Sequence, residues 1–368
     1  MPTFRYGHAS APDWRDAAKS CLEQLGGGSA TLGFLYITDL LADHAADIHA
    51  WFKVQTGVAH WTGAVGIGVC ATGQEYLDEP AIAVMVADFD PGTFRVFSGI
   101  SRAEQVDRAA IKCGNVPANF AVIHGDPGNR EVPDLVTKLA ERVESGFLVG
   151  GLVSSRRQNI QIADGVVENG ISGVSFSDAV TVATRLTQGC SPIGPKHGIT
   201  ACQRNVIVSL DGEPALDVFK EDIGETLARD LSRVGGHVFA GLPVPGSDTG
   251  DYLVRNLVGI DTTHKLVAIG DLIEPGGSIM FCRRDNSTAR EDMTRMLESI
   301  RQGLFTAPRG GVYFSCLGRG ASLFGPDSRE LKMIRDGLGD FPLVGFFCNG
   351  EISHNRLYGY TGVLTLFV

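Results

Sequence analysis

The stretch Gly-Val-Tyr-Phe-Ser-Cys at residues 311–316, followed by Leu-Gly-Arg-Gly-Ala-Ser-Leu-Phe-Gly at 317–325, sets the pattern of the chain. Here an apolar run leads through a glycine-rich turn into a helical pattern at about 327–338. A second apolar run at 341–348 ends in Asn-Gly-Glu, and a third run follows at 360–368. Periodicity and turn residues together predict the order strand, turn, helix, strand, loop, strand.

The same order occurs twice more along the chain, and such self-similarity is typical of an internally repeated fold. We interpret it as three copies of a β-α-β-β unit. Glu75 and Glu351 follow the second strands of the first and third copies, and we expect them at matched positions. The segments of the first copy are 32–37, 40–55, 65–70 and 81–87, and those of the second are 120–123, 131–145, 147–153 and 171–176.

These patterns predict an α/β (α+β) protein with two domains, built from repeated β-α-β-β units with mixed sheets. We place the boundary at about Gly212, where an Asp-Gly turn separates a strand from a long helical pattern. Residues 1–212 then hold the first two units, and residues 213–368 hold the third unit at 311–368. The length of 368 residues allows each domain to bury its own core.

The composition is that of a globular protein, with 43% hydrophobic and 20% charged residues. The formal net charge is −10 and no long basic stripe occurs, so we expect no nucleic-acid and no membrane partner. The N-terminus lacks the apolar stretch of a secretory signal, and no apolar run reaches the length of a membrane helix. We therefore expect a cytoplasmic protein whose eight scattered cysteines are reduced core thiols.

The glycine-rich turn at 318–325 lies between a strand and a helix, where a phosphate-binding turn would sit. Its third glycine comes too late for the dinucleotide fingerprint, so we do not expect a dinucleotide. A small anion could still bind there, with Arg319 as a bidentate clamp on a carboxylate. The alternative is a packing turn with Arg319 in water. Cys316 and His354 could form a nucleophile pair, although burial would make this thiol inert.

Three further residues keep two interpretations each. Glu75 and Glu351 are either a carboxylate pair for acid–base chemistry or ordinary loop carboxylates that cap a turn. His237 lies in a glycine-, proline- and apolar-rich loop at the supposed domain junction. It is either satisfied by the backbone or available as a haem-iron ligand, with His197 and His264 as weaker choices. The cysteines and histidines lack the spacing of a zinc site, so we expect no metal.

Several motifs resemble the FIST proteins, which are built from FIST N and FIST C sensory domains. The resemblance begins at about residue 31 and covers nearly all of the chain. Residues 70–75 read Cys-Ala-Thr-Gly-Gln-Glu where the family pattern is Cys-Ser-Thr-Ala-Gly-Glu, which makes Glu75 a weaker candidate than Glu351. The motifs are Gly-Gly-Leu-Val-Ser-Ser (150–155), Gln-Gly-Cys-Ser-Pro-Ile-Gly-Pro (188–195), Asp-Gly-Glu-Pro-Ala-Leu (211–216), Phe-Ser-Cys-Leu-Gly-Arg-Gly (314–320) with Leu-Phe-Gly (323–325), and Gly-Phe-Phe-Cys-Asn-Gly-Glu-Ile (345–352).

The resemblance implies a non-enzymatic cytoplasmic sensor that binds a small ligand in signal transduction. The ligand would be an amino acid or another small anion, bound by the glycine-rich loops between the two domains. Occupancy would bias a domain movement that a separate partner protein reads. The ligand-binding residues that we expect are Cys316, Arg319, Asn349, Glu351, Ser154 and Ser155.

A subset of free-standing family members is known as haem-binding nitric-oxide sensors, and this chain has the same free-standing layout. The resemblance therefore implies an alternative function, with haem b as the cofactor and His237 as its axial ligand. The partner would be a separate signalling protein, such as the histidine kinase of a two-component system or a cyclic-di-GMP enzyme. A homodimer is one candidate assembly. A further alternative is an enzyme of the hydrolase type that uses Cys316 or Glu351.

Overall fold

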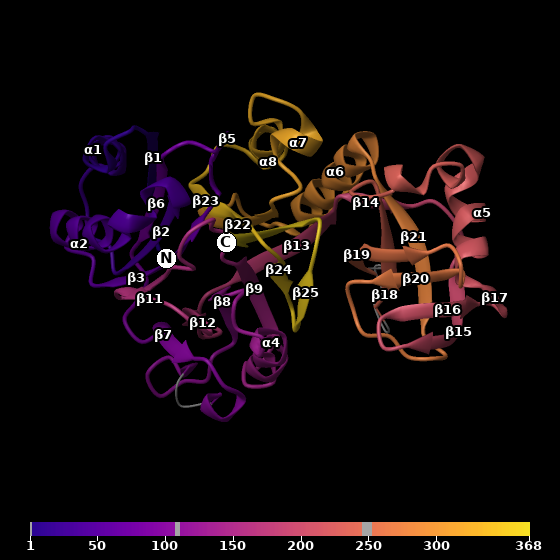
Figure 1. Ribbon diagram of the computed structural model, residues 1–368. Coiled ribbons are helices and arrows are strands. Elements are labelled where there is room, and N and C mark those ends of the chain that lie inside the picture. The colour runs from indigo at the N-terminus through magenta and orange to yellow at the C-terminus, as the bar shows by residue number, and fades with distance from the viewer. Residues whose placement is uncertain (1, 107–110, 245–251) are drawn as a thin grey trace. The chain divides into compact units, whose positions relative to one another are not determined.

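A computed structural model describes residues 2–106, 111–244 and 252–368. The chain forms two compact units (Figure 1). Unit 1 contains Met1–Thr187 and Asp292–Val368, and unit 2 contains Gln188–Glu291. Helices and mixed sheets occur together, so the predicted α+β class is confirmed. Within the described ranges, no helix combines the length and the apolar character that crossing a membrane requires.

Unit 1 consists of three repeats. Each repeat has a first strand, a helical segment, a parallel second strand, a short hairpin and an antiparallel third strand, which is the predicted β-α-β-β order with a hairpin added. Repeat 1 follows β1 (Phe4–Ser10) and α1 (Trp14–Leu25). Its elements are β2 (Leu32–Thr38), η1 (Asp39–His44), α2 (Ala45–Thr56), β3 (His60–Gly66), β4 (Gly68–Ala71), β5 (Gln74–Leu77) and β6 (Ala81–Ala87).

Repeats 2 and 3 have the same order of elements. Repeat 2 follows β7 (Phe94–Ile100) and η2 (Ala103–Gln105), whereas β13 (Val182–Gln188) and α6 (Asn286–Gly303) precede repeat 3. Repeat 2 contains β8 (Phe120–Gly125), α4 (Val132–Ala140), β9 (Phe147–Leu152), β10 (Gln161–Ala163), β11 (Val166–Val167) and β12 (Ile171–Phe176). Repeat 3 contains β22 (Gly310–Cys316), α7 (Ala321–Phe324), α8 (Arg329–Leu338), β23 (Leu343–Cys348), β24 (Glu351–Ser353), β25 (Arg356–Tyr358) and β26 (Thr361–Phe367).

Each repeat contributes its hairpin to the sheet of another repeat, and the three exchanges form a closed ring. The β4–β5 hairpin of repeat 1 pairs with β23 of repeat 3. The β24–β25 hairpin of repeat 3 pairs with β9 of repeat 2, and the β10–β11 hairpin of repeat 2 pairs with β3 of repeat 1. Each of the three sheets of unit 1 therefore has six strands in one common order. The three orders are β1-β6-β2-β3-β10-β11, β7-β12-β8-β9-β24-β25 and β13-β26-β22-β23-β4-β5.

A glycine in each second strand allows the first and second strands to pair closely. A Cβ atom on any of these glycines would lie only 1.7–1.8 Å from the carbonyl oxygen of the residue opposite, so a larger residue cannot be accommodated without a backbone shift. We call them the repeat glycines, because they mark equivalent positions in the three repeats. The pairs are Gly63 with Leu35, Gly150 with Ile123, and Gly345 with Tyr313.

The three repeats meet around one aromatic cluster in the core of unit 1. Tyr36, His124 and Phe314 occupy equivalent positions in the first strands, and their ring centroids are 5.6, 6.1 and 6.3 Å apart. Tyr36 Oη lies 3.2 Å from His124 Nε2, and both side chains are fully buried. Burial lowers the pKa of His124 to about 3, so this imidazole is neutral. The cluster is therefore part of the core rather than a charged site.

The helices form where the sequence carries the expected signals. Asp13 is the N-cap residue of α1, and its side chain accepts a hydrogen bond from Arg15 N at 2.9 Å. The apolar face of α4 buries Val132, Leu135 and Leu139, as the helical period predicts. Helix α1 packs on β1 and β6, and α4 packs on β9.

Unit 2 is an antiparallel sheet that closes on itself, because β18 pairs with both β19 and β21. Its core contains Leu216 and Phe219 from α5 and Phe281 from β21. The elements are β14 (Cys190–Pro192), β15 (His197–Gln203), β16 (Val206–Leu210), β17 (Glu213–Pro214), α5 (Ala215–Ala228), η3 (Leu231–Arg233), β18 (Val238–Pro243), β19 (Tyr252–Asp261), β20 (Leu266–Ile269) and β21 (Ser278–Arg284).

Two details of the sequence interpretation are wrong. The apolar run at 65–70 is not one strand, because β3 ends at Gly66 and β4 begins at Gly68. Glu75 and Glu351 are not at matched positions, since Glu75 lies in the second strand of its hairpin and Glu351 opens the first strand of its own. The register against the repeat glycines makes Gln161 the equivalent of Glu351.

The third repeat packs with the first two, because its strands and hairpin complete the ring of three sheets. The residues between β13 and α6 form unit 2. The predicted boundary at Gly212 falls inside unit 2, at the turn between β16 and β17, so the packed units do not follow the predicted domains. The domain division at Gly212 stays a prediction.

Candidate functional site

Polar side chains gather in each repeat where the first and second strands end. The carboxyl ends of neighbouring parallel strands meet at one edge of a sheet, and ligands commonly bind beyond that edge. The residues that end or follow the first strands are Asp39 in repeat 1, Asp126 in repeat 2 and Cys316 in repeat 3. The three strand ends differ in how far the chain fills them with its own side chains.

The strand end of repeat 1 is closed by an arginine from repeat 2. Arg156 donates from Nε and Nη2 to the Asp39 carboxylate, both at 2.8 Å, and from its backbone N at 3.0 Å. Its Nη1 binds Asp78 at 2.7 Å. Burial raises the pKa of Asp39, but the bonds to Arg156 outweigh burial and hold the pKa below its ordinary value. The loop after β9 is fixed by these contacts.

The strand end of repeat 2 is closed by its own loops. Asp126 Oδ1 accepts hydrogen bonds from Gly128 N at 2.7 Å and from Asn159 Nδ2 at 2.8 Å. Its Oδ2 accepts a hydrogen bond from Asn169 N at 3.1 Å. Both carboxylate oxygens are therefore occupied by the chain itself.

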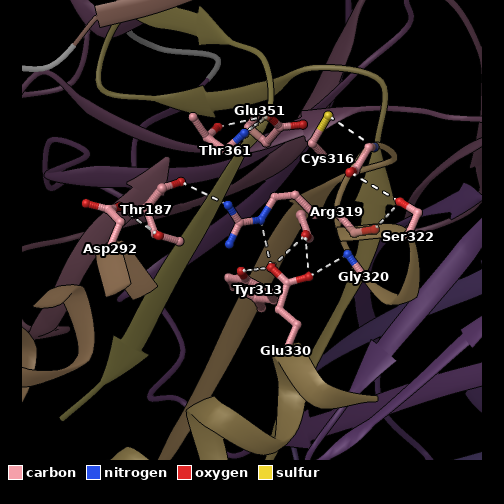
Figure 2. A network of polar contacts seen from close by, with 12 residues as sticks. Thr187, Asp292, Tyr313, Cys316, Arg319, Gly320, Ser322, Glu330, Glu351 and Thr361 are labelled. Carbon is pink, nitrogen blue, oxygen red and sulfur yellow. Dashed lines mark hydrogen bonds and ion pairs between the residues drawn. The ribbon is translucent and has the colours of Figure 1, made fainter. Parts of the chain in front are cut away.

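The strand end of repeat 3 contains a fully buried arginine (Figure 2). Arg319 donates from Nε to Glu330 at 2.7 Å and from Nη1 to the Thr187 carbonyl at 3.5 Å. Its Nη2 has no hydrogen-bond partner among the residues that the structure describes. Burial lowers the pKa of Arg319, but Glu330 outweighs this effect, so the side chain is a cation. Arg319 is thus neither in water nor a freely available clamp.

Glu330 fixes the turn that carries Arg319. Its carboxylate also accepts hydrogen bonds from Tyr313 Oη at 2.6 Å, from Gly320 N at 2.8 Å and from Ser315 Oγ at 3.1 Å. A buried ion pair is tolerated when further hydrogen bonds satisfy its atoms, as they do on the carboxylate side here. The network holds Arg319 in one position while one of its nitrogens stays unpartnered.

Glu351 is the second buried charged side chain at this strand end. Its Oε2 accepts hydrogen bonds from Thr361 N at 3.1 Å and from Thr361 Oγ1 at 2.8 Å. Its Oε1 has no hydrogen-bond partner in the described part of the chain. Burial raises the pKa of Glu351 to about 8, although Thr361 and Arg319 lower it. Glu351 is therefore mostly protonated at neutral pH.

The turn beside Glu351 is partly open to solvent. Cys316 and Gly318 are half-buried, and Asn349 is exposed. Cys316 Sγ accepts a hydrogen bond from Gly318 N at 3.5 Å. Burial raises the pKa of the Cys316 thiol and the neighbouring Glu351 raises it further, so the thiol is neutral at physiological pH. The structure thus brings together Cys316, Arg319, Asn349 and Glu351 from the glycine-rich turn and the loop after β23.

The two predicted serines belong to the loop after β9. Ser154 is buried, and its Oγ donates to the Phe347 carbonyl and accepts from Ile67 N at 3.0 Å. Ser155 Oγ accepts a hydrogen bond from Arg157 N at 3.0 Å. Ser154 therefore joins segments of all three repeats. Ligand contacts by the two serines stay predictions.

The structure does not bring Cys316 and His354 together. His354 lies at the tip of the β24–β25 hairpin, where its ring meets that of Phe147 at the start of β9. Cys316 ends β22, near Glu351 at the other end of the same hairpin. The nucleophile pair that the sequence allowed is therefore not formed, because the two residues lie at opposite ends of the hairpin.

His237 is exposed in the turn before β18. The role of His237 as a haem ligand stays a prediction. The two weaker candidates have their ring nitrogens near carboxylates. His197 contacts Asp211 at 2.7 Å and Asp222 at 3.0 Å, and His264 contacts Asp261 at 2.8 Å.

Sequence reasoning missed Glu330 and Thr361. Glu330 lies four residues before Ile334 on the buried face of α8, and a charged residue on an apolar stripe is a usable signal. Thr361 gave no such signal, because its contact with Glu351 depends on how β24 and β26 are placed in space.

Two family models match the chain, and they meet inside unit 2. The model of the FIST N domain matches residues 31–213, and that of the FIST C domain matches residues 215–354. Uncharacterized protein Rv0628c of Mycobacterium tuberculosis is 33% identical over 382 residues, with 98% of each chain covered. Uncharacterized protein Mb0898c of Mycobacterium bovis is 28% identical over 395 residues, again with 98% of each chain covered. FIST domains are in general sensory domains of signal transduction. The chain belongs to the FIST family and contains both its N and its C domain.

Proposed function

We propose that this protein is a non-enzymatic sensor that binds an amino acid at the strand end of repeat 3. The observation that carries the proposal is a pair of polar atoms, Arg319 Nη2 and Glu351 Oε1, that lack a hydrogen-bond partner among the described residues and belong to two fully buried side chains. A buried polar group without a partner costs free energy, which a ligand can recover. The free donor on a cation complements a carboxylate, and the free acceptor on a carboxyl group complements an ammonium group.

The other two repeats support this choice of site. Arg156 of repeat 2 binds Asp39 at the strand end of repeat 1, and Asn159 binds Asp126 at the strand end of repeat 2. In repeat 3 the corresponding loop offers Asn349, which is exposed. A bound amino acid would supply the groups that the chain itself supplies in the other repeats.

We infer binding without turnover. The Cys316 thiol is neutral at physiological pH, because burial and Glu351 raise its pKa. His354, the candidate base for this thiol, lies at the far end of the hairpin. A nucleophile without an adjacent base is poorly suited to catalysis. The hydrolase alternative therefore has less support than the sensor.

The hairpin that Glu351 opens offers a route for the signal. The β24–β25 hairpin belongs to repeat 3 in sequence but pairs with β9 in the sheet of repeat 2. A ligand that ionises Glu351 would act on a strand that two repeats share, and differential binding of this kind shifts a conformational equilibrium. The change would be read by a separate signalling protein, such as a histidine kinase or a cyclic-di-GMP enzyme.

A thermal-shift screen tests the ligand class. The panel contains the common amino acids, their N-acetyl derivatives, which lack the ammonium group, and their methyl esters, which lack the carboxylate. The proposal predicts that at least one amino acid raises the melting temperature and that both of its derivatives fail to do so. Equal shifts in melting temperature with the N-acetyl derivative would show that Glu351 does not bind the ammonium group. A ligand that is recovered unchanged after hours with the protein would support binding without turnover.

A further inference from the structure

A pocket of about 460 Å³ opens in unit 1 at the amino ends of β2 and β3, away from the strand end that carries Glu351. The volume falls within the roughly 300–1,000 Å³ that is typical of small-molecule sites. Its walls come from three segments: the residues before β2, the turn between α2 and β3, and the start of β7. They include Ala30, Thr31, Ala59, His60, Phe94 and Val96.

The ring of His60 is held in its orientation by Asp164. Its Nδ1 lies 3.0 Å from Asp164 Oδ2, and Asp164 Oδ1 accepts a hydrogen bond from Trp61 N at 2.8 Å. A carboxylate has no proton to donate, so the hydrogen of the neutral imidazole resides on Nδ1. The Nε2 atom is then a hydrogen-bond acceptor.

The remaining lining is mostly apolar, but it also includes the exposed side chain of Arg95. Phe94 is buried, and its ring lies 6.0 Å from that of Phe89 and 5.6 Å from that of His60, with the last two rings at 78°. Thr31 uses its hydroxyl inside the fold, since Oγ1 donates to the Phe89 carbonyl at 2.7 Å. The pocket thus combines an aromatic wall with the imidazole of His60 and the guanidinium of Arg95.

The equivalent place in repeat 2 is built differently. Phe147 stands where repeat 1 has His60, and its partner at the hairpin turn is His354, with ring centroids 5.5 Å apart. The loops before the two strands are also tied together there, because Ser145 N donates to the Asn119 carbonyl at 3.3 Å. The fold therefore accepts phenylalanine at this position, and the histidine of repeat 1 calls for another explanation.

We propose that the pocket binds a small aromatic molecule with one hydroxyl group, of the phenol class. The ring would pack against Phe94, and the hydroxyl would donate to His60 Nε2. Offset or edge-to-face contacts suit the aromatic wall, and a single acceptor suits a single donor. This site is independent of the amino acid site proposed above.

A fluorine NMR titration of 4-fluorophenol into the full-length protein tests this proposal. We expect saturable binding to the wild type and at least fivefold weaker binding to His60→Phe, which copies the residue of repeat 2. His44→Phe, at an exposed position of the same repeat, serves as the matched control and should bind as the wild type does. Ala59→Phe fills the pocket from an exposed position and should abolish binding.

A second ligand keeps the test decisive if His60→Phe fails to fold. The compound 4-fluoroanisole keeps the ring but lacks the hydroxyl donor, so we expect the wild type to bind it at least fivefold more weakly than 4-fluorophenol. Three results would overturn the proposal: no saturable binding of 4-fluorophenol to the wild type, unchanged affinity in Ala59→Phe, or equal affinities for the two compounds.

Discussion

Glu351 and Gln161 occupy equivalent positions, because each opens the hairpin that its repeat lends to a neighbouring sheet. Gln161 uses both of its polar atoms, since Oε1 accepts from Ser172 Oγ at 2.6 Å and Nε2 donates to the Gly170 carbonyl at 3.3 Å. Glu351 leaves Oε1 without a partner among the described residues. Repeat 2 thus holds a neutral amide at this position, and we expect Glu351→Gln to fold.

Replacing Glu351 by glutamine should remove a pH dependence of stability. The pKa of Glu351 rises from 4.5 to about 8 on folding, so the native state holds more protons than the unfolded state between these values. Native stability then falls as pH rises through this window. We expect the melting temperature of Glu351→Gln, relative to the wild type, to increase from pH 5 to pH 8 and then to level off. A difference that is constant with pH would contradict the buried, protonated carboxyl group.

Replacing Arg319 by methionine should destabilise unit 1 strongly. The substitution leaves Glu330 buried without its cation, and breaking a buried pair in this way costs about 3–5 kcal/mol. Urea unfolding measures the loss. The double variant Arg319→Met with Glu330→Gln should recover part of it, because no charge is then left unpaired. If the unfolding free energy of Arg319→Met is within about 1 kcal/mol of the wild-type value, the ion pair does not stabilise this turn.

Because of His197, the stability of unit 2 should fall as pH rises. A paired carboxylate has the opposite effect. Burial alone lowers the pKa of His197, but hydrogen bonds to Asp211 and Asp222 outweigh burial and raise the pKa above 6.5. The imidazolium therefore stabilises the fold below pH 6.5, and this contribution is lost as pH rises through the folded pKa. Asp222→Asn should cost about 1–2 kcal/mol in urea unfolding at pH 6 and less at pH 9. An equal cost at both pH values would contradict this linkage.

The repeat glycines should tolerate no side chain. A Cβ atom on Gly345 would lie 1.7 Å from the Tyr313 carbonyl oxygen, so Gly345→Ala must displace backbone and should cost about 3 kcal/mol or more. Gly165→Ala is the matched control, because its Cβ would meet nothing within 4 Å. Urea unfolding of both variants tests the difference. Similar stabilities would mean that β22 and β23 can move apart without a loss of folding free energy.

The sequence was sufficient for the repeated pattern but not for the pairing of the hairpins. The apolar run at 171–176 coincides with β12, because a buried strand between turns has a strong local signal. The pairing of β4 with β23 joins residues far apart in the chain, and no local pattern encodes such a partner. The apparent match of Glu75 with Glu351 failed for the same reason, since position in a hairpin depends on register.

The candidate site was predictable in its location but not in its contacts. The glycine-rich turn and the loop after β23 pointed to Cys316, Arg319 and Glu351, and these residues do share a strand end. Sequence alone left Arg319 either on a ligand or in water, whereas it is buried against Glu330. That contact depends on which face of α8 turns inward. The unpartnered atoms Arg319 Nη2 and Glu351 Oε1 become visible only when all neighbours are placed.

Glu75 provides a matched control for the proposed site. Like Glu351 it is a buried glutamate with one unpartnered oxygen, and burial raises its pKa to about 7. It lies near Glu330, the partner of Arg319, and its carboxyl group accepts a hydrogen bond from the backbone of Ala321 in the same turn. A glutamine at position 75 removes a similar carboxyl group but keeps an amide oxygen that can accept from Ala321 N, so the turn is expected to stay in place.

Calorimetric titration of the best amino acid from the screen is the most direct test of the central claim. An ammonium group favours the ionised form of Glu351, so binding to the wild type should release a proton and tighten as pH rises toward 8. Glu351→Gln should bind at least tenfold more weakly and without proton release, while Glu75→Gln should bind as the wild type does. Wild-type affinity and pH dependence in Glu351→Gln would show that the strand end of repeat 3 is not the ligand site.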